Sequence, residues 1–247
     1  MTRERTIISC RENLPLTVVT WAIAILDKSV YPSKMEQDEE IDWAAILASV
    51  ESGVEPHDYI YITPETVAIF SLKDCEEQLR RASDEKLRLA QALKSAHLAV
   101  QAALTAALAG SMNIGAHPEK LMFKKLAYYQ EGQGERPDDD RVLPFKGLLE
   151  RAMNAPLEWT QQPLSLDEHE QDLLARLCSL RDGIEHPKQS HWGIEIAYIL
   201  EVLPLAARTA VKLLEVVVHH LEPGESAQLQ ELAAQVDTHC HTMQEAL

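Results

Sequence analysis

Three polar residues in the C-terminal third of the chain combine the side-chain types needed to move protons and to bind charged oxygen. Arg181 is followed at once by Asp182, and His186 comes five positions after the arginine. Histidine exchanges protons near neutral pH, because its unperturbed pKa lies there. A guanidinium group matches the geometry of an oxyanion and stabilises negative charge that develops during a reaction. These residues are the strongest candidates in the chain for acid–base chemistry on an anionic substrate.

Two strongly helical segments must position these residues. The pattern Ser165-Leu166-Asp167-Glu168 resembles a capping box and predicts a helix that runs to about Arg181. Gly183 and Pro187 are expected to break the chain after it. A second, long helix is predicted from residue 192 to residue 221. The three polar residues should therefore lie at the junction of two helices.

Helix-forming patterns also cover most of the remaining chain, and no strand-turn-strand pattern or glycine-rich phosphate loop occurs. Further helices are expected at 15–28, 42–51, 64–109 (one helix, or two with a second start at Ser83-Asp84-Glu85), 118–129, 142–153 and 226–245. Residues 131–141 are the best candidate for disorder. The predicted fold class is all-α, with a helical bundle at 63–247 and a mostly helical N-terminal extension at 1–62.

The charge of the chain limits how it can contact nucleic acids. The 247 residues carry a formal net charge of −16, and residues 1–80 and 81–247 contribute equally to it. Non-specific binding of nucleic acids depends on Lys and Arg contacts to phosphate, so an acidic surface disfavours it. Activity on RNA would need a local basic cleft, a basic partner or a short single-stranded substrate.

The cysteines and the apolar segments favour a cytoplasmic protein. Cys10, Cys75, Cys178 and Cys240 are far apart, which predicts reduced thiols rather than a disulfide framework. The uncharged run at 14–26 is too short to span a bilayer and lacks the flanks of a signal peptide, so a buried helix is expected there. No membrane association is predicted.

The stretch Leu180-Arg181-Asp182-Gly183-Ile184-Glu185-His186-Pro187 resembles the signature of the HEPN superfamily, in which an arginine and a polar residue are followed, after a short spacer, by a histidine. The segment at 145–150 is similar to the helix that often lies upstream of that motif. The resemblance covers roughly residues 84–221. It implies a compact antiparallel helical bundle, and many members of the superfamily are metal-independent ribonucleases.

The resemblance also implies an activity and a role for each residue. RNA would be cleaved by attack of a 2′-hydroxyl on the adjacent phosphate, with His186 as acid or base and Arg181 on the phosphate. Asp182 would orient His186 or the arginine of a second copy. A helix turns about 100° per residue, so Arg181 and His186 would lie about 140° apart. A break at Gly183, or a homodimer with the motif near its interface, would bring the groups together.

Other interpretations remain open for the same residues. Many HEPN domains are non-catalytic interaction or regulatory modules, which fits the acidic charge, and the motif could also be an accident in an unrelated bundle. Arg181 could pair with Glu185 or Glu195, and both motif cations could cap a helix C-terminus. The possible partners are an RNA substrate and an antitoxin or another regulatory protein, in a stress response or in defence against phage.

The remaining candidates for chemistry are weaker. His219-His220 and His239-Cys240-His241 match no zinc spacing, so no metal site and no cofactor are expected. Lys120, Lys124 and Lys125, followed by two tyrosines, could hold a nucleic-acid strand, although a solvated helix face is the simpler interpretation. His97 is expected to be packed or half-exposed on its helix, and the tryptophans are expected in the core or at interfaces.

Overall fold

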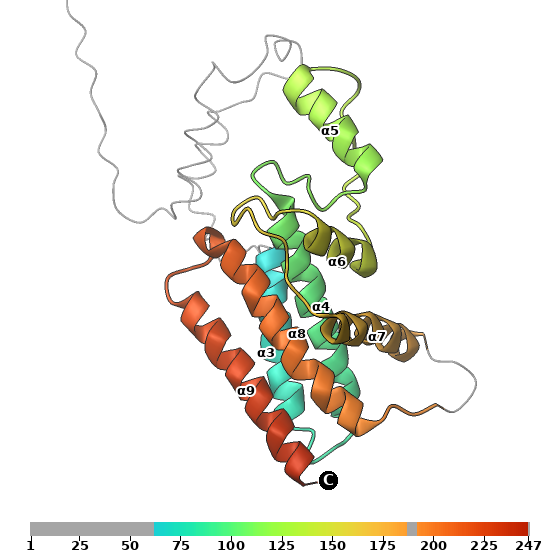
Figure 1. Cartoon of the computed structure of the whole chain (residues 1–247), viewed down its shortest axis with the longest axis vertical. Helices are drawn as coiled ribbons and strands as arrows, with labels where there is room; N and C mark the ends of the chain where they lie inside the picture. The colour runs from blue at the N-terminus through green and yellow to red at the C-terminus, as the bar shows by residue number, and fades with distance from the viewer. Residues whose placement is uncertain (1–61, 187–191, 247) are drawn as a thin grey trace, which may run out of the picture. The chain divides into compact units, whose positions relative to one another are not determined.

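The computed structural model describes residues 62–186 and 192–246, and all regular structure within these ranges is helical (Figure 1). The helices are α3 (Pro64–Arg80), α4 (Arg88–Ala109), α5 (Glu119–Glu131), α6 (Phe145–Asn154), α7 (Glu168–Glu185), α8 (Ile196–Val216) and α9 (Glu225–Glu245), with a 3-10 helix, η3, at Val218–His220. The prediction of an all-α fold is confirmed for these residues. The predicted extension at 1–62, apart from Ile62, lies outside them.

Four helices form the centre of the described structure. α3 packs against α4, α4 against α8, and α8 against α9, while α9 also contacts α3. Short turns join α3 to α4 and α8 to α9, so each pair runs antiparallel (Figure 1). Leucine and alanine make up most of the core, with some valine, isoleucine and cysteine, and burying one leucine side chain contributes about 1.5–3 kcal/mol. Hydrophobic burial therefore accounts for this arrangement.

Side-chain caps determine where two of the helices begin. Thr63 accepts a hydrogen bond from the backbone N–H of Thr66, and Pro64 occupies the first helical position of α3, where the predicted helical segment 64–109 begins. The capping box of α7 is formed by Asp167 and Glu170. It lies two residues later than the predicted pair Ser165 and Glu168. Pattern and structure thus agree on the helix, and differ on which carboxyl group closes its first turn.

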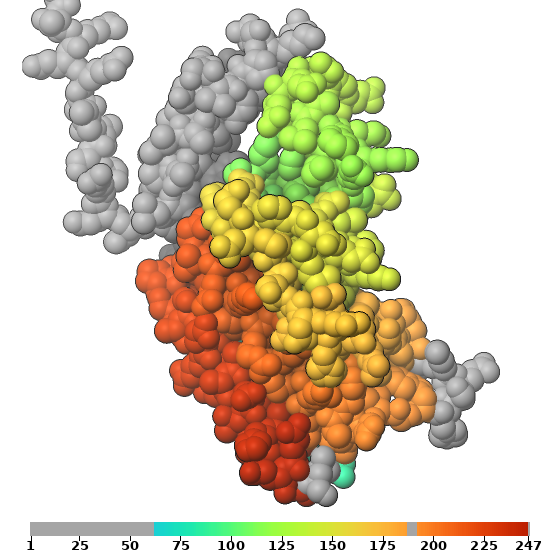
Figure 2. Space-filling model, in the orientation of Figure 1, coloured from blue at the N-terminus to red at the C-terminus, as the bar shows by residue number. Residues whose placement is uncertain are grey.

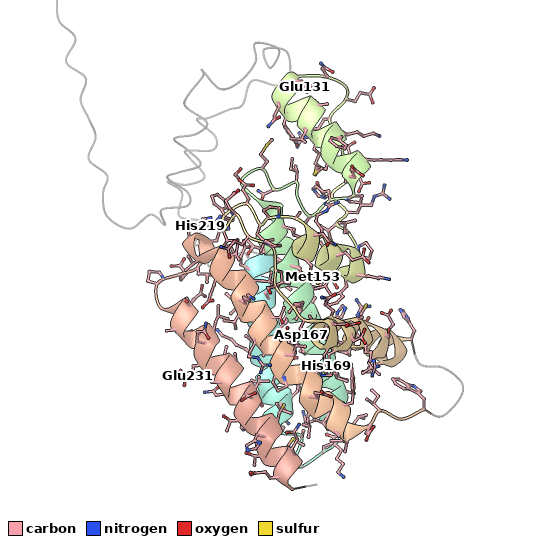
Figure 3. The ribbon with its side chains drawn as sticks, viewed as in Figure 1. Glu131, Met153, Asp167, His169, His219 and Glu231 are labelled. Atoms are coloured by element: carbon pink, nitrogen blue, oxygen red, sulfur yellow. The ribbon has the colours of Figure 1, made fainter. Side chains whose placement is uncertain are left out.

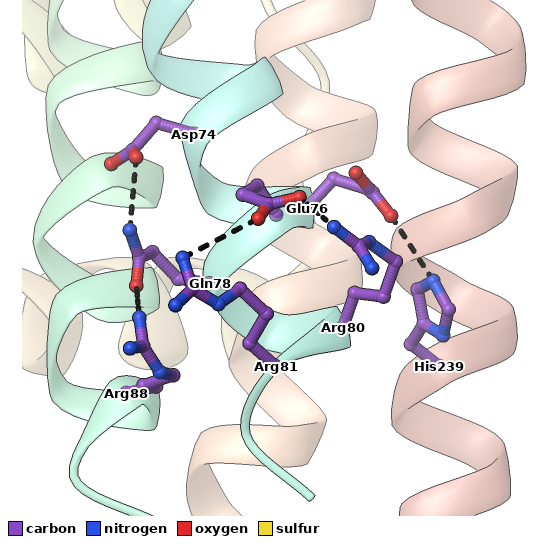
Figure 4. A network of polar contacts seen from close by, with 8 residues as sticks. Asp74, Glu76, Gln78, Arg80, Arg81, Arg88 and His239 are labelled. Atoms are coloured by element: carbon purple, nitrogen blue, oxygen red, sulfur yellow. Dashed lines mark hydrogen bonds and ion pairs between the residues drawn. The ribbon is translucent and has the colours of Figure 1, made fainter. Parts of the chain in front are cut away.

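The segment at 64–109 forms two helices, but the second does not begin at the predicted position. α4 starts at Arg88 with Leu87 before it, and no side chain caps its first turn. Polar contacts tie this turn to its neighbours (Figure 4). Gln78 donates to Asp74 over 3.1 Å and accepts from Arg88 over 3.0 Å. The chain reversal is therefore stabilised by side chains of α3, and not by a cap at Ser83.

α6 and α7 add a second group of helices that contacts α4. The segment that joins them lies against α8 in the view of Figure 2. Lys212 of α8 donates a hydrogen bond to the carbonyl oxygen of Ser165 in this segment over 3.2 Å. Figure 3 places Asp167 and His169 at the N-terminal end of α7, and His169 bonds to Glu201 of α8 over 2.9 Å. These contacts fix the start of α7 on the bundle.

α7 also corrects one prediction, because Gly183 does not break it. The helix continues through Gly183 to Glu185, and His186 forms its C-terminal cap. A β-carbon at Gly183 would lie 3.0 Å from the ring of Trp192. Gly183 therefore has a packing role: the missing side chain makes room for the tryptophan. A glycine in a helical pattern can serve this purpose without ending the helix.

α4 is a long helix that carries only two charged side chains, Arg88 and Lys94. Within residues 62–186 and 192–246, it is the one helix with the length and mean hydropathy, 1.2, of a membrane span. About 67% of that apolar stretch is buried inside the protein, against α3 and α8. Core helices and membrane spans share this composition, and here the apolar surface is used in packing.

Candidate functional site

The last turn of α7 carries Arg181, Asp182 and Glu185, and the structure brings these three side chains together. Arg181 Nη1 lies 2.8 Å from Asp182 Oδ1 and 3.1 Å from Glu185 Oε2. The arginine side chain is about one-quarter exposed, whereas both carboxylates are more exposed. One cation therefore faces two anions, and the pairing with Glu185 is one of those considered from the sequence.

A buried histidine of α4 holds the other side of the guanidinium group. Arg181 Nε donates to His97 Nδ1 over 3.4 Å, which is long for a hydrogen bond. The ring of His97 stacks on Phe145 of α6, with 4.5 Å between the ring centroids. Helices α4, α6 and α7 thus each supply a residue at this point. His97 is buried, as one of the two interpretations of the sequence expected.

The surroundings of His97 keep its imidazole neutral. Burial and the positive charge of Arg181 lower the pKa of His97 from 6.5 to about 4, while Asp182 acts in the opposite direction. Because Nδ1 accepts the hydrogen bond from Arg181, the proton must be on Nε2. That N–H is buried and has no hydrogen-bond partner within the described residues. An unpaired buried donor costs about 1–3 kcal/mol, so an unpaired N–H of this kind is unusual in a folded protein.

His186 stands apart from this group. Its side chain is exposed, and its backbone N–H donates to the carbonyl oxygen of Asp182 over 2.9 Å. No side chain in the described ranges bonds to its imidazole. Because α7 runs unbroken through Gly183, the side chains of Arg181 and His186 leave the helix about 140° apart, and one copy does not bring them together. Asp182 contacts the arginine of its own chain and does not contact the His186 ring.

A groove opens beside the end of α7. It has a volume of about 480 Å³ and is mostly apolar; its lining includes Lys86, Leu87, Gly183, Ile184, Trp192 and Ile196. Trp192 is 44% exposed and Leu87 is 70% exposed. The sequence placed Trp192 in a core or an interface, and the structure leaves one part of its ring open to solvent beside the motif.

The basic cluster of α5 is divided by the fold. Lys125 is buried and pairs with Asp140, so it cannot contact a ligand in this arrangement. Lys120 and Lys124 are exposed, as is Phe123 between them. Two exposed lysines on one helix are typical of a solvated face.

The histidine pair near η3 forms a small cluster of its own. His219 lies after the C-terminal end of α8 (Figure 3), and its ring contacts Trp159 with 4.4 Å between centroids. His220 Nδ1 lies 3.0 Å from Glu65 Oε1. Burial would raise the pKa of Glu65, but its hydrogen bonds, chiefly the one from His220, outweigh this and lower it.

Across the residues that the structure describes, no group of three or more His, Cys, Asp or Glu side chains could hold a metal ion.

Sequence reasoning singled out Arg181, Asp182 and His186 but gave no role to His97 at this site. One signal was present: His97 continues the core stripe formed by Leu93, Val100 and Leu104, at four- and three-residue steps. A histidine in such a stripe must be buried and must find a partner. The partner lies 84 positions away on another helix, so only the fold identifies it.

Comparison with known proteins adds no family to this description. The chain matches no protein-family model, and neither the curated proteins nor the solved structures include one that is significantly similar to it.

Proposed function

We propose that the chain is a HEPN-like, metal-independent endoribonuclease that acts as a homodimer. The 2′-oxygen of a ribose attacks the adjacent phosphorus while a base removes the 2′-proton. The bond from phosphorus to the 5′-oxygen breaks, and an acid protonates that oxygen. The products are a 2′,3′-cyclic phosphate and a 5′-hydroxyl. No metal ion takes part in these steps. The reaction needs one cationic group to stabilise the phosphate and one or two titratable groups to move the protons.

The contact between Arg181 and buried His97 is the observation that carries this proposal. His97 is a polar residue within an otherwise apolar helix face, and its burial leaves one N–H unpaired. Its one hydrogen bond goes to Arg181. The fold thus tolerates a costly buried group at the point where the guanidinium is held. Such preorganisation is what a phosphate-binding arginine requires, because a fixed donor stabilises a transition state without rearranging.

The remaining group, His186, supplies the proton chemistry in this proposal. It is exposed, whereas His97 has its pKa lowered to about 4 and cannot act as an acid near pH 7. His186 and Arg181 diverge within one copy, so a single chain does not complete the site. A two-fold dimer would place His186 of one copy beside Arg181 of the other. The proposal therefore requires association of two chains.

A second candidate function is a non-catalytic HEPN-like module that binds a regulatory partner. The two carboxylates on Arg181 favour it, because Arg181, Asp182 and Glu185 together carry one net negative charge. A phosphate would have to displace them. The net charge of −16 acts in the same direction. In this alternative the salt bridges of Arg181 stabilise the end of α7 as part of a protein-binding surface, and no RNA is cleaved.

An assay of RNA cleavage in excess EDTA separates the two functions. Purified protein is incubated with a mixed RNA pool beside the His186→Gln and Arg181→Ala variants, and the product ends are identified. Cleavage that leaves cyclic phosphates and is lost in both variants supports the nuclease. The histidine His169, which is exposed and pairs with Glu201, provides the matched control, and His169→Gln should cleave normally. Absence of cleavage by the unmodified chain, at concentrations where it is dimeric, favours the binding module.

A further inference from the structure

The groove beside the end of α7 has features that the proposed cleavage reaction does not use. Most of its wall is aliphatic and comes from three places in the sequence: the start of α4, the last turn of α7, and the segment that leads into α8. Its volume, about 480 Å³, lies within the range of small-molecule sites. Gly183 and Ile184 line it and follow the motif residues directly. Along the helix axis they lie only about 3–5 Å from Arg181.

Trp192 forms one wall of the groove and is held in place by Gly183. The edge of its indole ring would lie 3.0 Å from a β-carbon at position 183, so the ring packs against the bare backbone of α7. At 44% exposure, part of the ring remains available. A half-exposed tryptophan over an apolar groove offers a flat surface on which a planar, weakly polar group can stack.

Lys86 supplies a positive charge at the same groove. It lines the groove just before α4 and has no ion-pair partner within the described ranges. The other cations nearby are engaged: Arg80 and Arg81 pair with Glu77, and Arg88 pairs with Glu85. The acids on the other side, Asp182 and Glu185, face Arg181. Among the described residues that line the groove, Lys86 is the one charged side chain, so it can contact a ligand there.

We propose that this groove receives an unpaired base of single-stranded RNA next to the phosphate that Arg181 holds. The base stacks on Trp192, the aliphatic wall covers its edge, and Lys86 contacts a neighbouring phosphate. Stacking on an aromatic side chain combined with a lysine contact is the general mode by which proteins hold single strands. A base within a duplex has both faces covered and cannot enter. This inference rests on the proposed function and names the substrate class: single-stranded rather than duplex RNA.

Binding of an uncleavable strand tests the groove without relying on cleavage. The probe is a fluorescent 2′-O-methyl oligoribonucleotide of about ten nucleotides, within the usual site size, and its duplex serves as a second probe. Fluorescence anisotropy should show that the full-length chain prefers the single strand. Trp192→Ala should weaken that binding by roughly 5- to 150-fold, the loss expected for one stacked base. Trp192→Phe, which retains an aromatic face, should remain close to the unmodified chain.

Two matched variants make the result specific. Trp159 is a similarly exposed tryptophan, 42%, beside η3 at the far end of α8, about 30 Å along the helix from Ile196. Trp159→Ala should bind RNA normally. Gly183→Ala should keep or raise the melting temperature, because alanine favours a helix, yet weaken binding by displacing the Trp192 ring. Equal affinities for the unmodified chain, Trp192→Ala and Trp159→Ala would overturn the proposal.

The outcomes separate this inference from the proposed nuclease. Binding that depends on Trp192, without any cleavage, would retain the base subsite and reject the nuclease. Cleavage that depends on His186 but is unchanged in folded Trp192→Ala would retain the nuclease and reject the subsite. Sedimentation of Trp192→Ala provides the last arm. If that variant is monomeric where the unmodified chain is dimeric, the groove is an interface between copies, and the base-binding proposal fails.

Discussion

The four-helix centre of the molecule and the end of α7 bury very different groups. Between α3, α4, α8 and α9, the buried side chains are mostly leucine and alanine, and nearly all of the remainder are also apolar. At the end of α7, a buried histidine with an unpaired N–H meets an arginine that is shared by two carboxylates. The first region supplies stability. The second uses some of it to hold polar groups in defined positions.

This contrast predicts how a substitution in each region will change the free energy of unfolding. Truncations in the bundle should act through lost burial and cavities, independently of pH. Changes at the α7 end should have smaller effects on stability that depend on protonation. Four substitutions test the contrast, and their expected effects on the free energy of unfolding decrease from Leu104→Ala to His186→Gln.

Leu104→Ala should have the largest effect, lowering the free energy of unfolding by about 2–5 kcal/mol. Leu104 is fully buried on α4, so truncation removes its burial and leaves a cavity. Urea denaturation followed by circular dichroism measures the loss. Leu87→Ala is the control, because Leu87 is 70% exposed and should change stability by no more than about 0.5 kcal/mol. Similar losses in both variants would contradict the assignment of the core.

His97 should make the stability depend on pH. Its pKa is lowered to about 4 in the folded chain, so its contribution is complete above pH 6.5 and is lost as the pH falls toward 4. Over that window the unfolded chain binds a proton that the folded chain refuses, which costs up to about 3 kcal/mol. His97→Leu should flatten this part of the profile. Parallel profiles for the two proteins between pH 6.5 and 4 would show that His97 is not held neutral.

Arg181→Ala should cost less, about 1–2 kcal/mol, because it leaves Nδ1 of His97 without a donor. It also removes a positive charge that lowers the pKa of His97, so the pKa of that imidazole should rise. Nuclear magnetic resonance titration of the His97 ring would measure the change. If the ring titrates identically in both proteins, the Arg181–His97 contact does not exist in solution.

His186→Gln should have the smallest effect on folding, within about 0.5 kcal/mol of the unmodified chain, because the side chain is exposed. The same substitution should abolish the proposed RNA cleavage. The pair of measurements sharpens the contrast between the regions. A large loss of stability would mean that His186 has a structural contact, and retained cleavage would remove it from the site.

The sequence predicted the helices more accurately than the residues between them. Local signals determined the beginning of α3, where Thr63 and Pro64 act within one turn. They failed at the start of α4, which no side chain caps, and at Gly183, whose role depends on a ring nine positions later. The capped start of α3 is a local event, whereas the uncapped start of α4 and the space that Gly183 leaves for Trp192 are set by tertiary packing.

The candidate site shows the same division. Arg181 and Asp182 are neighbours in the chain, yet the sequence-based prediction paired Asp182 with His186 or with the arginine of a second copy. The structure instead pairs it with Arg181 of its own chain. His97 and Lys86 reach this part of the molecule only because α4 packs against α7. Long-range contacts of this kind have no signature in a single sequence. The salt bridge to Glu185 was one of two options in the sequence, because residues four apart share a helix face. The sequence alone did not distinguish it from a salt bridge to Glu195.

The alanine-rich face of α4 limits how the sequence can drift. Ala92, Ala96, Ala99, Ala103 and Ala107 are buried where neighbouring helices approach. Small side chains permit close approach of helix backbones, so these positions leave no room for a larger residue. Homologues should conserve small volume there more strictly than hydrophobicity, accepting glycine or serine before valine or leucine. Elsewhere in the core the preference should be reversed, because the leucine positions tolerate exchange among large apolar residues and resist truncation.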